Sequence, residues 1–113
     1  MHEMSLTEGV LRILEDEARK QKFTRVKKVW LQIGVLSHAE PDAMLFCFDA
    51  VTKGTLADGA VLEIIRTPGK AWCMKCSDSV AIEQRYDACP ECGGYQLQVV
   101  EGDELQVKEL EVA

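Results

Sequence analysis

The sequence predicts an α/β fold: a small sheet with two helices, plus an inserted four-cysteine ribbon near the C-terminal side. Three observations support this prediction. Apolar residues recur at helical spacing in two segments, they alternate as in strands in several others, and four cysteines form two C-x-x-C hooks at 73–76 and 89–92. The chain has 113 residues, 47% of them hydrophobic, which is enough for one ordinary domain with a small appendage.

The first helix is predicted to begin at Ser5, because Ser5-Leu6-Thr7-Glu8 has the form of a capping box. Its buried face is expected to consist of residues at helical spacing, namely Leu6, Val10, Leu14 and Ala18. Val29, Leu31 and Ile33 then alternate with polar or amphipathic neighbours, which indicates a strand that ends at Gly34.

A second helix is predicted from Pro41, which suits a first helical turn, with Glu40 near the cap position. The apolar residues expected on its buried face are Met44, Leu45, Phe48 and Val51. A strand is expected from Val61 to Ile65.

Thr67-Pro68-Gly69 has the composition of a hinge before the cysteine segment. Short strands are expected near Val80–Ile82 and Gln96–Val100. In the last strand the apolar residues change parity between Val107 and Leu110, which predicts a bulge or burial on both faces. We therefore expect one α/β domain formed by residues 1–68 and 101–113, with a ribbon domain inserted at residues 69–100.

The spacing Cys73-x2-Cys76-x12-Cys89-x2-Cys92 is typical of a tetrahedral four-cysteine zinc site. Such a site has no open coordination position, so we expect a structural ion and no catalysis. The alternative of two disulfides is disfavoured, because a fifth cysteine, Cys47, is left over and residues 1–5 do not resemble a secretion signal. A reducing, cytoplasmic location is expected.

Charge and motifs disfavour several classes of function. The net charge of −6 disfavours nucleic-acid binding, and no apolar run approaches the ~20 residues that span a bilayer. No P-loop or G-x-G-x-x-G pattern is present, so a GTPase activity would have to come from a partner. Cys47 is interpreted as a small buried thiol; a nucleophile with His38 as its base is the alternative, and no third group supports it.

The amino terminus forms a second candidate metal site. The Met1 amine, the His2 amide nitrogen and the His2 imidazole can chelate one ion in adjacent rings, and such nitrogen ligands suit Ni2+ or Cu2+. On this feature alone, an ordinary exposed histidine is the more common reading.

Three features in this order closely resemble the HypA/HybF family of hydrogenase nickel-incorporation proteins. They are Met1-His2-Glu3 opening an amphipathic helix, the strand Val29–Gly34, and the double C-x-x-C segment. The resemblance covers essentially the whole chain. It implies a nickel metallochaperone, not an enzyme, that carries Ni2+ as cargo and Zn2+ as a structural ion.

The resemblance also implies site residues and partners. Nickel would be bound by His2 with Glu3 and Glu40, and zinc by Cys73, Cys76, Cys89 and Cys92. The implied partners are a nickel-binding GTPase of the HypB type and the precursor of the NiFe-hydrogenase large subunit. A homodimer is compatible with the sequence.

The chain departs from many family members in one place. Gly93 and Gly94 follow the second hook, where those members have a histidine, so no histidine ligand is expected there. His38 is interpreted as a solvated loop residue, with an added nickel ligand as the alternative. A zinc-ribbon interaction module without a nickel role is the competing function, and the two functions differ in whether they need His2.

Overall fold

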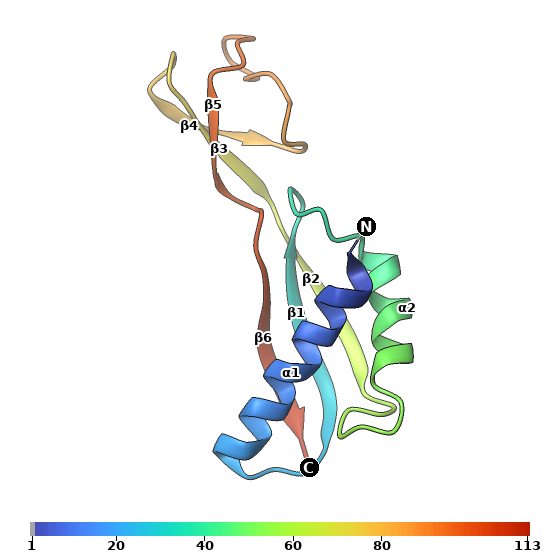
Figure 1. Cartoon of the computed structure of the whole chain (residues 1–113). Helices are drawn as coiled ribbons and strands as arrows, with labels where there is room; N and C mark the ends of the chain where they lie inside the picture. Colours follow the sequence, from blue (N-terminus) through green and yellow to red (C-terminus); the bar gives the residue numbers. More distant parts are fainter. Residues whose placement is uncertain (1) are drawn as a thin grey trace. The chain divides into compact units, whose positions relative to one another are not determined.

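The computed structural model describes residues 2–113. Its elements, in chain order, are α1 (Glu3–Gln21), β1 (Val26–Gly34), α2 (Pro41–Val51), β2 (Val61–Thr67), β3 (Gly69–Cys73), β4 (Asp78–Ile82), β5 (Leu97–Glu101) and β6 (Leu105–Val112) (Figure 1). The strands form two sheets of three, ordered β2-β1-β6 and β4-β3-β5. The predicted α/β class, with two helices, a small sheet and a cysteine-rich insertion, is confirmed.

The chain divides into two compact units. The first, which we call the helical unit, contains the residues up to Leu31, Ala39–Ile64 and Gln106–Ala113. The second, the cysteine unit, contains Gln32–His38 and Ile65–Leu105. The assignment of residues 69–100 to a zinc domain and of the remainder to a nickel domain stays a prediction about function.

Helix α1 buries the predicted stripe through Val10 and Leu14, at 2% and 0% exposure. The predicted start at Ser5 is wrong. The helix begins at Glu3, because the Leu6 N–H donates to the His2 carbonyl at 2.9 Å and closes an earlier turn. Because the helix begins at Glu3, Ser5 lies inside it and does not cap it. The Thr7 hydroxyl donates to the Glu3 carbonyl at 2.7 Å within this first part of the helix.

Helix α2 begins at Pro41 as predicted, with Glu40 as its N-cap. The Glu40 carboxylate accepts a hydrogen bond from the Asp42 N–H at 3.4 Å. Met44 and Phe48 are buried as predicted, but Leu45 is 42% exposed, so its assignment to the buried face is wrong. Leu45 lies about 100° around the helix from Met44, where the packed face ends.

β3 is the central strand of the cysteine unit. It pairs antiparallel with β4, where Ala71 lies opposite Val80, and with β5, where Ala71 lies opposite Val99. The buried core of this unit contains Leu36, Ala71, Cys73, Val80, Ile82 and Cys89. Two of these six side chains are thiols of the predicted metal site, so the site is part of the core of the unit.

Three glycines permit close backbone approach within the cysteine unit. A Cβ on Gly34 would lie 1.9 Å from the carbonyl oxygen of Gly102, and one on Gly69 would lie 2.5 Å from that of Ile82. Gly102 also has a φ of +98°, a conformation that side-chain-bearing residues rarely adopt. The close approach of Gly34 and Gly102 is accompanied by a hydrogen bond from the Leu36 N–H to the Gly102 carbonyl at 2.7 Å.

The last strand, β6, lies at an edge of its sheet. Leu105 and Val107 on one face and Leu110 on the other are all partly buried, and Val112 is 40% exposed, so neither face is fully buried. An edge strand has a neighbour on one side, which limits how much of it the fold covers. Neither described helix is long and apolar enough to cross a membrane.

Candidate metal centres

The four cysteines of the two hooks converge on one point. One ligand atom from each of Cys73, Cys76, Cys89 and Cys92 lies within 4.8 Å of the others. The sulfurs of Cys73 and Cys92 are 3.8 Å apart, and those of Cys76 and Cys89 are 3.9 Å apart. Each of these pairs joins the two hooks. Zinc–sulfur bonds of about 2.3 Å in a tetrahedron separate the sulfurs by about 3.8 Å, so the donor set fits a zinc ion.

The two hooks have the same local conformation. The Ser77 N–H donates to the Cys73 carbonyl and the Gly93 N–H donates to the Cys89 carbonyl, both at 2.8 Å. Ser77 and Gly93 each follow the second cysteine of a hook and have positive φ values of 53° and 74°. This turn directs both thiols of a hook to one side. Glycine adopts it without steric cost, whereas Ser77 adopts it at some steric cost.

Hydrogen bonds and crowding separate the acidities of the thiols. The Cys76 N–H donates to the Cys73 sulfur at 3.4 Å and lowers the pKa of Cys73 to about 7. The neighbouring thiols of Cys92 and Cys73 raise the pKa of Cys76 to about 12. Thiols this close cannot all ionise without a cation, because like charges disfavour one another. A divalent metal would supply the compensating charge.

The predicted nickel ligands lie at the start of the two helices of the helical unit. His2 is the exposed N-cap residue of α1, and Glu3 is the first residue of that helix. The Glu3 carboxylate accepts a hydrogen bond from the Glu40 N–H at 3.1 Å, which connects the first turn of α1 to the N-cap of α2. The Met1 amine, the remaining predicted donor, lies outside the described residues.

The two candidate sites differ in how their ligands are gathered. Within residues 2–113, a group of three or more His, Cys, Asp or Glu ligand atoms close enough to hold one ion is found at the four cysteines. His2, Glu3 and Glu40 are not gathered in this way. The hydrogen bond from Glu40 nevertheless places its backbone N–H beside the Glu3 carboxylate.

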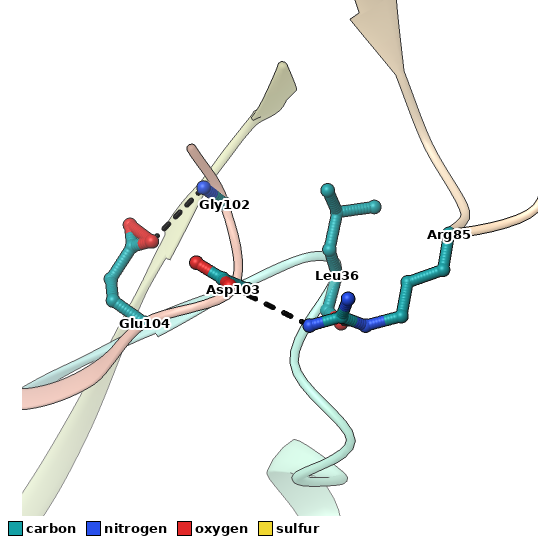
Figure 2. Close-up of polar contacts among 5 residues, drawn as sticks. All are labelled: Leu36, Arg85, Gly102, Asp103 and Glu104. Atoms are coloured by element: carbon teal, nitrogen blue, oxygen red, sulfur yellow. Dashed lines mark hydrogen bonds and ion pairs between the residues drawn. The ribbon is translucent and has the colours of Figure 1, made fainter. Parts of the chain in front are cut away.

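A polar network in the cysteine unit was not predicted from the sequence. Figure 2 shows the Arg85 side chain directed toward Leu36 and Asp103. Its Nε donates to the Leu36 carbonyl at 3.1 Å, and its Nη2 lies 3.6 Å from an Asp103 carboxylate oxygen. Arg85 comes from the segment between the two hooks, so this contact fixes that segment to the loop after β1.

Glu104 is the second centre of this network (Figure 2). It accepts a hydrogen bond from the Gly102 N–H at 3.0 Å, which Figure 2 draws. It also accepts hydrogen bonds from the Thr67 hydroxyl and from Gln32, the latter at 3.3 Å. The Thr67 hydroxyl holds the pKa of Glu104 below its ordinary value. Thr67 and Gln32 are 37 and 72 residues away in sequence, so no local pattern could have revealed these pairings.

The alternative catalytic residues have no support in the geometry. Cys47 is partly buried on α2, short of the full burial expected for a structural thiol, and His38 is exposed. The four-thiol cluster has its donors directed at one point and offers no position for an activated water.

Comparison with known proteins connects this fold to one family. The family model described as "Hydrogenase/urease nickel incorporation, metallochaperone, hypA" matches residues 1–112. A relative from Azotobacter chroococcum mcd 1, named hydrogenase maturation factor HypA, is 62% identical over 112 residues, which is 99% of both chains. The protein of the same name from Azotobacter vinelandii is 59% identical over the same share of both chains.

Solved structures have the same fold. The solution structure of the Ni metallochaperone HypA from Helicobacter pylori superimposes with a TM-score of 0.74. The alignment covers 99% of this chain and 97% of that chain, at 23% sequence identity. At this identity the likeness establishes the arrangement of elements and leaves the ligands to be argued from the residues themselves.

Proposed function

We propose that this chain, which belongs to the HypA family of hydrogenase and urease nickel-incorporation metallochaperones, binds Ni2+ at its amino terminus and holds Zn2+ at its four cysteines. Family membership makes it a maturation factor and not an enzyme. The proposal extends this to the ions and their ligands. The observation that carries it is a contrast between the two units. One unit has a closed cluster of thiols, and the other has an exposed histidine at the start of a helix.

Zinc is the ion proposed for Cys73, Cys76, Cys89 and Cys92. Four thiolates satisfy its tetrahedral preference, and the sulfur spacings match that geometry. Because two of the thiols belong to the buried core, the ion would stabilise the cysteine unit throughout the life of the protein.

Nickel is the cargo proposed for His2, with the Met1 amine, Glu3 and Glu40 as further ligands. Nitrogen donors suit Ni2+, and the exposure of His2 leaves them within reach of a competing protein. A receiving site can then replace the ligands one at a time, which a closed site does not allow.

The proposed partners supply what the chain lacks. A HypB-type nickel-binding GTPase would provide nucleotide hydrolysis, because no P-loop is present. The precursor of the NiFe-hydrogenase large subunit would receive the ion during maturation. We place these steps in the cytoplasm, where the thiols remain reduced.

Nickel titration of the purified protein tests the assignment of His2. The wild-type chain is expected to bind one nickel ion in addition to zinc, and His2→Ala is expected to lose that binding while its zinc content and circular dichroism are unchanged. His38→Ala is the matched control, because His38 is also exposed. Stoichiometric nickel binding by His2→Ala would show that the site lies elsewhere. Absence of nickel binding by both the wild-type chain and His2→Ala would leave a zinc-ribbon interaction module as the function.

A further inference from the structure

Helix α2 presents an apolar face that the fold leaves uncovered. Five consecutive apolar residues occupy positions 44–48, and two of them, Met44 and Phe48, are buried. Leu45 is 42% exposed and Phe46 is 75% exposed. A helix that is apolar around its circumference is normally covered on all sides, and exposed apolar clusters of this kind mark interaction sites.

Two carboxylates flank this apolar centre. Asp42 lies four residues before Phe46 and Asp49 lies three residues after it, and both are exposed. Residues separated by three or four positions are neighbours on one face of a helix. The face therefore has an apolar middle with one negative charge on the turn above and one on the turn below.

The same helix is connected to the amino terminus. Glu40, the N-cap of α2, donates its backbone N–H to the Glu3 carboxylate at 3.1 Å, and α1 packs against α2. His2, Glu3 and the α2 face all belong to the helical unit. A protein that docks on α2 thus binds the helix whose N-cap contacts Glu3, one of the proposed nickel ligands.

We propose that the face formed by Asp42, Leu45, Phe46 and Asp49 is the docking surface for a protein that exchanges nickel with the amino terminus. The partner presents an apolar pocket for Phe46, with lysine or arginine side chains on its rim. Aromatic side chains at the centre of an interface commonly dominate binding, and complementary charges around them steer association. The exchange of nickel and the two partner proteins used in the test rest on the proposed function.

A second copy of this chain is a poorer occupant of the face. It would bring Asp42 and Asp49 of both chains around one apolar centre, and juxtaposed like charges oppose such an association. A partner with basic residues on its rim removes this conflict.

Calorimetric titration with the purified nickel GTPase and with the purified hydrogenase precursor tests the proposal. Phe46→Ala is expected to weaken binding to at least one of them by about 30-fold, as for a central aromatic residue. Asp42→Asn with Asp49→Asn is expected to weaken the same complex less and to reduce its dependence on salt. Ile13→Ala is the matched control: Ile13 is 45% exposed but lies on α1, so its loss is expected to leave binding unchanged.

Three results would overturn the proposal. The first is that Phe46→Ala binds both proteins with wild-type affinity, and the second is that the wild-type chain binds neither of them. The third is that sedimentation shows the wild-type chain to self-associate and that Phe46→Ala abolishes this self-association. Thermal unfolding and nickel titration of Phe46→Ala are run alongside and are expected to match the wild type. A wild-type chain that docks through Phe46 but binds no nickel would retain the docking surface and refute the nickel site.

Discussion

The cysteine cluster and the amino terminus are built in opposite ways. The cluster gathers four thiols in a preformed set, and two of them are core residues of their unit. The amino terminus offers an exposed histidine beside one carboxylate, with its predicted amine donor at the end of the chain. Ligands that are part of a core retain an ion as long as the core is folded, whereas exposed ligands release it to a competitor. The comparison indicates why a delivery protein needs both kinds of site.

Loss of one thiol is the largest expected effect. Cys73→Ser should remove the zinc and unfold the cysteine unit, because structural zinc contributes about 10–16 kcal/mol in small zinc-dependent folds near pH 7. Zinc analysis together with amide NMR spectra checks this, and the resonances of the helical unit are expected to persist. Cys47→Ser is the control and should keep its zinc. A Cys73→Ser protein with an intact cysteine unit would mean that the metal is dispensable for folding.

A methyl group added where two backbone segments touch tests whether the metal alone organises the cysteine unit. Gly34→Ala places a Cβ 1.9 Å from the carbonyl oxygen of Gly102, so the end of β1 and the segment between β5 and β6 must move apart. We expect a destabilisation of about 3 kcal/mol or more in denaturant unfolding, at the upper end for overpacking. Gly9→Ala is the matched control, since nothing lies within 4 Å of its added Cβ, and it should stabilise α1 by about 1 kcal/mol. Equal stability of Gly34→Ala and wild type would assign the fold of the unit to the metal.

The Glu104 network gives a smaller effect that depends on pH. The folded-state pKa of Glu104 lies below its ordinary value of 4.5, so its ionised form stabilises the fold above that pH. The stabilisation is lost as the pH falls through the folded-state pKa. Glu104→Gln should therefore unfold at a lower temperature than the wild type at pH 7 and pH 5.5, with the difference shrinking below pH 4.5. A difference that grows on acidification would contradict this.

The sequence predicted features that depend on local chemistry. Pro41 after Glu40 located the start of α2, and the spacing of the hooks predicted that four thiols would meet. The start of α1 was missed because the His2 carbonyl accepts the first helical hydrogen bond, which a capping pattern at Ser5 does not reveal. Arg85 and Glu104 were missed because their partners are distant in sequence.

The exposure of the α2 face was missed for a different reason. A run of apolar residues shows that burial is favourable, but it does not show which of them a second layer covers. Met44 and Leu45 have the same chemical character, and the fold buries the first and exposes the second. Burial on α2 depends on which of its sides α1 and the rest of the fold cover, which is a property of the tertiary structure.

Metal analysis before and after a chelator wash tests the central claim most directly. The protein would be loaded with one equivalent of nickel, exposed to EDTA at neutral pH, and analysed for both metals. The two-site account predicts that zinc remains at one ion per chain while nickel is removed. Joint retention of both ions, or their joint loss, would contradict the division between a resident ion and a delivered one.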